Sequence, residues 1–87
     1  MKNSTENLTE PEYIAIASRL KSLRKEKGYS NYEHIAYDLG MSRSAYWRLE
    51  QGVNFELKTL IKICKLLNIT LEQFFEGVDF PKTNKIQ

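Results

Sequence analysis

The segment from Ser30 to Gly52 constrains the fold more than any other part of this 87-residue chain. Its sequence is SNYEHIAYDLGMSRSAYWRLEQG, and a glycine ends each of its two halves. Ser30, in capping-box spacing with Glu33, and Ser42 are the expected helix caps. The pattern predicts two short helices separated only by residues 40–42. So short a break does not allow antiparallel packing, so we expect a steeply crossed helix-turn-helix that presents its second helix outward.

A longer helix is predicted before this segment. Thr9 has capping-box spacing to Glu12 at its expected start, and Gly28 is its expected end. The apolar side chains of this helix recur at helical spacing and are expected to face the core. They are Tyr13, Ile16, Ala17, Leu20 and Leu23.

Two more helices are predicted after the segment. Asn54 is the expected N-cap of the fourth helix, and Thr70 and Gln73 have capping-box spacing at the start of the fifth. The residues expected to face the core from the fourth helix are Leu57, Leu60, Ile61, Cys64 and Leu67. Those expected from the fifth are Leu71, Phe74 and Phe75. The chain is therefore predicted to be an all-α protein of five helices.

These helices define one predicted domain at residues 9–77, between expected flexible segments at 1–8 and 78–87. Cys64 is the only cysteine, and the start of the chain lacks the apolar run of a signal peptide. We therefore expect a cytoplasmic protein with no membrane partner. The net charge of +2 permits nucleic-acid binding without requiring it, so the positions of the charges must decide.

The third predicted helix has a core face and an outward face when its residues are placed at intervals of about 100°. Ala45 and Leu49 face inward, and Tyr46 lies at the border. The outward face carries Arg43, Ser44, Trp47 and Arg48. An exposed tryptophan between two arginines is unusual on a surface with no partner, so this face is predicted to bind something.

Three motifs carry a family resemblance: Ala36 and Gly40 at their mutual spacing, the pattern LExG at the end of the third helix, and the ending LLNITLEQFF. With these motifs, residues 20–75 resemble the XRE family, the five-helix DNA-binding domain of the lambdoid phage repressors and Cro. The resemblance implies a lambda-repressor-like helix-turn-helix fold. It also implies a sequence-specific, double-stranded DNA-binding transcriptional regulator of bacterial or phage type, associated with the nucleoid.

By this resemblance, residues 43–51 form the recognition helix, whose first residues enter the major groove. The residues that match base-contacting positions are Arg43, Ser44 and Arg48. Arginine is suited to the O6 and N7 acceptors of guanine. Trp47 is a further candidate, for a thymine methyl or the sugar-phosphate edge, although the family usually has a small or polar residue there. A protein interface is the alternative for Trp47.

The candidates for phosphate contacts are Asn31, Tyr32, Tyr46, Asn54 and Lys58. All of them except Tyr46 lie at the start of the second or fourth helix, where unpaired backbone N–H groups favour phosphate oxygens. Tyr46 replaces a usual aliphatic residue, so its ring is expected to pack inward while its hydroxyl reaches solvent or phosphate. The resemblance also implies a structural salt bridge between Arg24 and Glu50, which would hold the recognition helix to the first helix.

Other classes of function and partner were weighed on the same residues. A protein-interaction module, such as an antitoxin whose main partner is a protein, is the alternative to a DNA-binding regulator. An enzyme, a metal and a cofactor are not expected, because His34 is the lone histidine and no catalytic or metal-ligand spacing occurs. No separate small-molecule domain is expected either. One domain covers a short DNA site, and family members usually bind as homodimers, so a homodimer is implied.

Overall fold

The computed structural model describes residues 10–53 and 55–82, and this part of the chain contains helices and no strands. The five helices are α1 (Pro11–Glu26), α2 (Tyr32–Leu39), α3 (Arg43–Glu50), α4 (Leu57–Leu67) and α5 (Leu71–Glu76). The predicted all-α fold of five helices is confirmed. None of these helices is long and apolar enough to cross a membrane.

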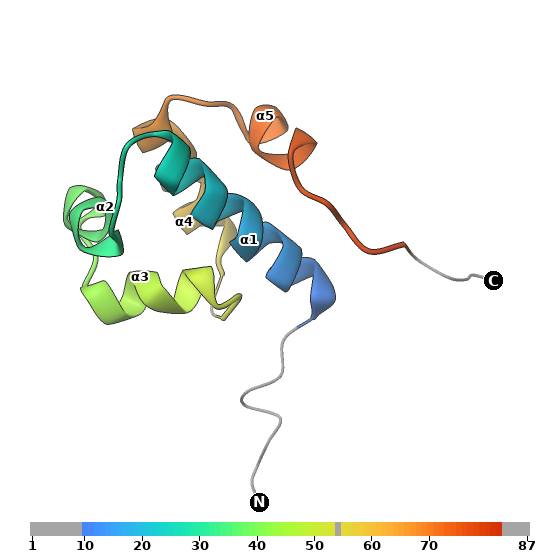
Figure 1. Cartoon of the computed structure of the whole chain (residues 1–87), viewed down its shortest axis with the longest axis horizontal. Coiled ribbons are helices and arrows are strands. Elements are labelled where there is room, and N and C mark those ends of the chain that lie inside the picture. Colours follow the sequence, from blue (N-terminus) through green and yellow to red (C-terminus); the bar gives the residue numbers. More distant parts are fainter. Residues whose placement is uncertain (1–9, 54, 83–87) are drawn as a thin grey trace, which may run out of the picture.

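The helices are arranged around α1, which crosses the centre of the domain in Figure 1. α3 packs against both α1 and α2, α2 also contacts α4, and α4 contacts α5. The α2–α3 pair and α5 therefore lie on opposite sides of α1 in Figure 1. This arrangement leaves one long face of α3 without a helix packed on it.

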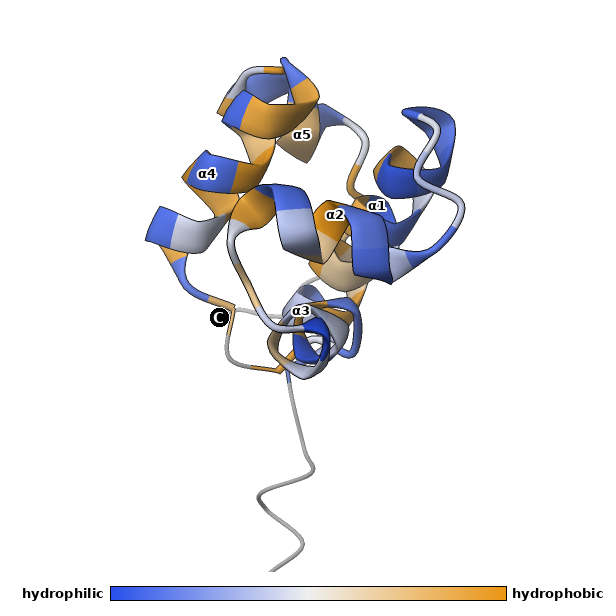
Figure 2. Ribbon diagram, turned by 90° about the vertical axis from the view of Figure 1, so that its left-hand side faces the viewer, coloured by the Kyte–Doolittle hydropathy of each residue, from blue (hydrophilic) through white to orange (hydrophobic). Residues whose placement is uncertain are grey.

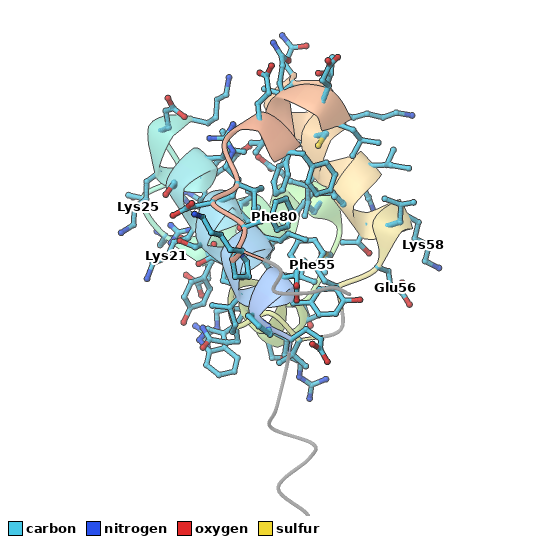
Figure 3. All side chains as sticks on the ribbon, turned by 90° about the vertical axis from the view of Figure 1, so that its right-hand side faces the viewer. Lys21, Lys25, Phe55, Glu56, Lys58 and Phe80 are labelled. Atoms are coloured by element: carbon cyan, nitrogen blue, oxygen red, sulfur yellow. The ribbon has the colours of Figure 1, made fainter. Side chains whose placement is uncertain are left out.

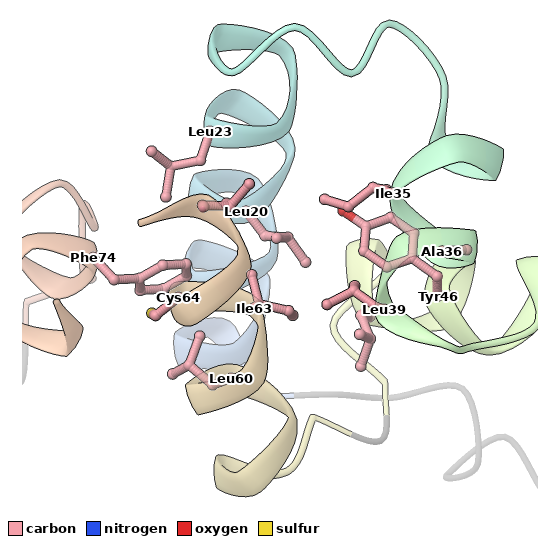
Figure 4. Packing of buried hydrophobic residues seen from close by; sticks show 12 residues of the cluster. Leu20, Leu23, Ile35, Ala36, Leu39, Tyr46, Leu60, Ile63, Cys64 and Phe74 are labelled. Carbon is pink, nitrogen blue, oxygen red and sulfur yellow. The ribbon is translucent and has the colours of Figure 1, made fainter. Parts of the chain in front are cut away.

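The core receives side chains from all five helices, and Figure 4 shows how they meet between α1, α2, α3 and α4, with Phe74 entering from α5. The largest fully buried side chains are Tyr46, Phe74, Leu20, Ile35, Leu39 and Ile63. Their burial removes apolar surface from water, which is the main favourable contribution to folding. α3 shares in this core, so its orientation is fixed by the same packing that holds the domain together.

Two predicted helix caps are confirmed and one is wrong. The Ser42 hydroxyl accepts the Ala45 N–H at 3.1 Å, and Thr70 forms the predicted capping box with Gln73. At the start of α2, Asn31 and not Ser30 is the N-cap, and its Oδ1 accepts backbone N–H groups at 3.0 and 3.2 Å. Ser30 is one residue too far from the first helical residue, Tyr32, to take this position.

The starts of α1 and α4 differ from the other helix starts. Thr9 and Asn54, the predicted caps, lie outside the described residues. α1 begins at Pro11 and α4 at Leu57, so their N-cap positions are taken by glutamates, neither of which makes a side-chain cap hydrogen bond. Pro11 at the start of α1 lacks the backbone N–H that would otherwise need a partner there.

The core face of α4 is rotated from the predicted stripe. Leu57 is 63% exposed and Ile61 36% exposed, whereas Ile63, which was not predicted, is fully buried. The buried residues are Leu60, Ile63, Cys64 and Leu67, which also follow a helical repeat. Two apolar stripes overlap in the sequence of this helix, and packing against α2 and α5 selects one of them.

Tyr13 in the first turn of α1 was also predicted to face the core, but it is 43% exposed. At the other end of the domain, the predicted core residues of α5 do pack on the cluster, with Phe74 fully buried and Leu71 and Phe75 half-buried. Arg19 of α1 donates from Nε to the carbonyl oxygen of Phe74 at 2.9 Å, which fixes the short α5 to α1.

Candidate nucleic-acid interface

The turn between α2 and α3 sets the angle at which α3 leaves the domain. Gly40 ends α2 with a φ of +72°, in the left-handed region where a side chain would be strained. The Gly40 and Met41 N–H groups donate to the carbonyl oxygens of Tyr37 and Ala36 at 3.0 and 2.9 Å. These bonds satisfy the last carbonyls of α2 and make a rigid corner, after which Ser42 caps α3.

The core face of α3 is shifted from the predicted one, since Ala45, which was predicted to face inward, is only half-buried. Leu49 faces inward as predicted and is 2% exposed. Tyr46 was placed at the border with its hydroxyl available to phosphate, but it is fully buried, and the hydroxyl donates to Glu50 Oε2 at 2.7 Å. Burial, together with this hydrogen bond, raises the pKa of Tyr46. The prediction of a phosphate contact by Tyr46 is therefore wrong, because α1 and α2 pack over α3 from two sides and enclose the ring.

The structure contains the expected ion pair between Arg24 of α1 and Glu50 at the end of α3. The Arg24 Nε and Nη2 groups donate to Glu50 Oε2 and Oε1 at 2.6 and 3.4 Å, and both side chains are 5% exposed. Burial alone would lower the pKa of Arg24, but the hydrogen bond and charge of Glu50 raise it overall. The Arg24 guanidinium therefore stays charged, and the pair joins the end of α3 to α1.

Arg24 also fixes the loop that leads into α2. Its Nη1 donates to the carbonyl oxygen of Tyr29 at 2.8 Å, and the Tyr29 hydroxyl donates to Asp38 Oδ2 at 2.7 Å. The hydrogen bond to Asp38 raises the pKa of Tyr29. The Arg24 guanidinium thus links α1 to α3 and to the loop that precedes α2. Both helices of the motif are therefore attached to α1.

The predicted base-contacting residues occupy the outward face of α3. Arg43, Ser44, Trp47 and Arg48 are all exposed, and Trp47 has 46% of its surface exposed. Figure 2 shows α3 at the lower edge of the domain, with the other helices above it. The structure therefore brings these four side chains together on one accessible helix surface, which we call the recognition face.

Sequence reasoning missed a contact at the first residue of the recognition face. The Arg43 Nη1 group donates to Oε2 of Glu33 in α2 at 3.0 Å, and the two side chains are 66% and 63% exposed. Glu33 was interpreted only as a partner in a capping box with Ser30. The opposite charges ten positions apart were the available signal, but only the crossing angle of α2 and α3 brings them together.

The other predicted phosphate contacts have mixed surroundings. Asn31 is exposed, but its Oδ1 is used by the cap of α2, which leaves its amide N–H groups as the donors for a phosphate. Tyr32 is half-buried and packs against the core cluster. Lys58 is 86% exposed and lies beside Glu56 at the start of α4, with 3.9 Å between Lys58 Nζ and Glu56 Oε1 (Figure 3). Asn54 lies outside the described residues.

No group of histidine, cysteine or acidic side chains suited to a metal ion occurs within residues 10–53 and 55–82. Cys64 is buried in the core face of α4, and burial raises the pKa of its thiol. Arg43 and Arg48 are exposed charged groups on α3. Their hydrogen-bond donors suit an anionic or acceptor-rich partner.

Comparison with known proteins matches residues 20–74 to a helix-turn-helix family model. Control protein C.MunI of a Mycoplasma species is 36% identical over 67 residues, which cover 76% of this chain and 90% of that protein. Plasmid copy control protein CopR of Streptococcus agalactiae is 44% identical over 52 residues, which cover 59% of this chain and 56% of that protein. No solved structure matches the chain significantly.

These matches agree with the resemblance found in the sequence and with the geometry of α2 and α3. Both relatives are control proteins by name, so the alternative of an antitoxin is not favoured. The family model covers well over half of the chain, and it includes the whole motif and the Arg24–Glu50 pair. The chain therefore belongs to the helix-turn-helix family of DNA-binding transcriptional regulators, of the XRE type.

Proposed function

We propose that the chain regulates transcription from the cytoplasm by binding a specific duplex DNA sequence, with α3 in the major groove. The observation that carries the proposal is the recognition face, where two arginines are exposed on a helix whose opposite face is buried and whose end is tied to α1. A helix held in this way can present its side chains to base edges in one orientation. A gene-regulatory role needs no catalytic group, and we propose none.

Arg43 and Arg48 are the proposed specificity residues. Each guanidinium can donate two parallel hydrogen bonds to O6 and N7 of a guanine, and a good pair of this kind contributes about 1–3 kcal/mol of discrimination. Ser44 is exposed on the same face as the two arginines, and its hydroxyl can pair with several bases, so it adds less. Trp47 is proposed to contact a thymine methyl or the sugar-phosphate edge with its exposed ring surface.

Phosphate contacts are proposed at the edges of the recognition face. At the N-terminus of α2 the backbone N–H groups of Glu33 and His34 already donate to Asn31 Oδ1, so the proposed donors there are the amide N–H groups of Asn31 and the hydroxyl of Tyr32. Lys58 and Asn54 are proposed to contact phosphates of the DNA backbone. The negative charge of Glu56 weakens the contribution of Lys58. Such contacts fix the register of the protein on DNA but carry little sequence information.

A homodimer is the proposed DNA-binding form. One recognition helix covers only a few base pairs, and two copies on half-sites about one helical turn apart would give a longer, two-fold symmetric site. Apolar side chains that are exposed on α4 and in the segment after α5, namely Leu57, Ile61 and Phe80, support an interface on these elements. The recognition face of α3 would then remain available to DNA.

The proposal is tested by selecting bound duplexes from a random DNA pool with the purified full chain and measuring binding of the selected duplex at several salt concentrations. We expect a symmetric consensus and a Kd that rises steeply with salt, because phosphate contacts release counterions. A pool that yields no consensus, or binding that does not respond to salt, would overturn the proposal.

A further inference from the structure

We infer that Glu33 is a positioning residue that holds Arg43 in the orientation needed to bind a guanine, and that it thereby sets specificity at one base pair. This inference rests on the proposed function of the recognition face. Its physical basis is the contact between Arg43 Nη1 and Glu33 Oε2, 3.0 Å long, which joins the first turns of α2 and α3 at the surface.

The contact uses only the Nη1 group of the Arg43 guanidinium. Nε and Nη2 form another edge of this planar group, and no hydrogen bond from this edge is formed to the described part of the chain. Arg24 shows what this edge can do, because its Nε and Nη2 donate to the two carboxylate oxygens of Glu50. O6 and N7 of guanine present a similar pair of acceptors. Arg43 can therefore keep Glu33 as a partner while it binds a base.

Holding the guanidinium in advance matters because a long exposed side chain has many rotamers, and fixing one of them on binding reduces affinity for the correct base. An arginine without a fixed orientation can also turn toward a neighbouring base or phosphate. With Glu33 in place, a guanine at the correct position gains the full pair of hydrogen bonds, whereas another base gains less. The effect therefore appears in discrimination between bases.

The negative charge of Glu33 has a separate effect. A carboxylate near the DNA backbone is repelled by phosphates and lowers binding to every sequence by a similar factor. Positioning by Glu33 increases discrimination at one base pair, whereas its charge lowers affinity for every sequence. Experiments can therefore separate the two effects. Removing the carboxylate should raise binding to unrelated DNA while it lowers discrimination at the base pair contacted by Arg43.

The test uses the full chain, its selected duplex, and duplexes with each alternative base at the position where Arg43→Ala relaxes specificity. We expect Glu33→Gln to reduce discrimination at that base pair by about 3- to 10-fold, the range expected for losing the pre-positioning of one side chain. Discrimination at the other positions should stay unchanged. Glu76→Gln, which changes an exposed glutamate on α5, is the matched control and should alter neither quantity.

Two further variants separate positioning from charge. Glu33→Asp keeps the charge but shortens the side chain, so it should lower discrimination without raising binding to unrelated DNA. In an Arg43→Ala background, Glu33→Gln should cause no further loss of discrimination, because the side chain that it positions is absent. Thermal melting checks that the variants fold, and the exposed pair predicts little change in Tm.

The possible outcomes decide between the inference and the function on which it rests. Unchanged discrimination in Glu33→Gln and Glu33→Asp, with specific binding by the wild type, overturns the role of Glu33 and leaves the proposed function in place. A uniform change over all sequences also overturns it, since only charge repulsion would then remain. A wild-type chain that selects no duplex overturns the proposed function itself, and the role of Glu33 with it.

Discussion

The two ends of the recognition helix are each tied to a neighbouring helix by an arginine–glutamate pair, but the two pairs lie in opposite environments. At the end of α3, Glu50 pairs with Arg24 of α1 and both side chains are 5% exposed. At the start of α3, Arg43 pairs with Glu33 of α2 and the side chains are 66% and 63% exposed. The same chemical groups therefore meet inside the domain at one end and in water at the other.

This difference in burial predicts different roles. Removing one partner of a buried pair leaves an uncompensated charge and costs about 3–5 kcal/mol, whereas an exposed pair contributes about 0.2–1 kcal/mol or less. The Arg24–Glu50 pair thus affects the stability of the fold and the attachment of α3. The Arg43–Glu33 pair contributes little to stability, so its effect is expected on binding.

The largest effect is expected from Glu50→Leu, which leaves Arg24 and the Tyr46 hydroxyl buried without their acceptor. The free energy of unfolding should fall by about 3–5 kcal/mol, measured by denaturant unfolding. The double variant Arg24→Met, Glu50→Leu should recover the part of this loss that comes from the unpaired charge, because it replaces the pair with apolar side chains, although the Tyr46 hydroxyl still lacks its acceptor. Glu33→Gln is the control and should change stability by less than about 1 kcal/mol. An equal loss of unfolding free energy in Glu50→Leu and Glu33→Gln would contradict the different contributions expected of the buried and the exposed pair.

The next effect concerns binding at the exposed end. Arg43→Ala should cost about 1–3 kcal/mol of affinity for the selected duplex and relax specificity at about one base pair. Binding is measured with the selected duplex and its single-base variants. Arg48→Ala should relax a different position, which makes it a matched comparison on the same helix. A uniform loss over all duplexes would identify Arg43 as a phosphate contact.

A smaller effect is expected from Tyr46→Phe, which removes the hydroxyl that donates to Glu50. The loss of this hydrogen bond should lower the free energy of unfolding by about 0.5–1.5 kcal/mol. DNA affinity should not change, since the ring is fully buried, whereas Tyr32→Phe tests a tyrosine that is proposed to contact phosphate. A loss of DNA affinity without a loss of stability in Tyr46→Phe would contradict the buried position of the hydroxyl.

The pH dependence of Tyr46→Phe follows from the raised pKa of the native tyrosine. A raised pKa in the folded state means that folding favours the protonated hydroxyl. Its stabilising contribution is therefore complete below the unfolded pKa of about 10 and is lost as the pH rises above that value. The difference in unfolding free energy between wild type and Tyr46→Phe should accordingly shrink at alkaline pH.

The smallest effect is expected at a third pair, Lys58 with Glu56, which is also exposed and whose charged atoms are 3.9 Å apart. Lys58→Ala should weaken binding to all sequences about equally and reduce the slope of log Kd against log salt by about one. Lys21→Ala, an exposed lysine on α1, is the control and should leave the slope unchanged. An unchanged slope in Lys58→Ala would mean that Lys58 does not contact phosphate.

The sequence was sufficient to predict the five helices and the outward face of α3. Glycines and capping residues act locally, so Ser42, Thr70 and Gly40 could be interpreted without knowledge of the tertiary structure. The neighbouring Asn31 and Ser30 are both good caps, and a shift of one residue was enough to make that assignment wrong. The Arg24–Glu50 pair was expected only because of the family resemblance.

Other features depended on contacts between helices. Ile61 and Ile63 both belong to plausible apolar stripes of α4, and only its packing partners determine which one is buried. The helical angle of Tyr46 gave a border position because it takes no account of two neighbouring helices. The meeting of Arg43 and Glu33 likewise depends on the angle at which α2 and α3 cross. Periodicity within one helix contains none of this information.

The two arginines of α1 have a consequence for the cooperativity of the domain. Arg19 donates hydrogen bonds to the carbonyl oxygens of Gln73 and Phe74 in α5. Arg24 donates to the carboxylate of Glu50 at the end of α3. Helices of six and eight residues are too short to persist alone in water. Neither can therefore detach from α1 and remain helical, so a local opening that frees α3 also unfolds it. A chain in which α3 has come away from α1 would then have lost the ordered surface that is proposed to bind DNA.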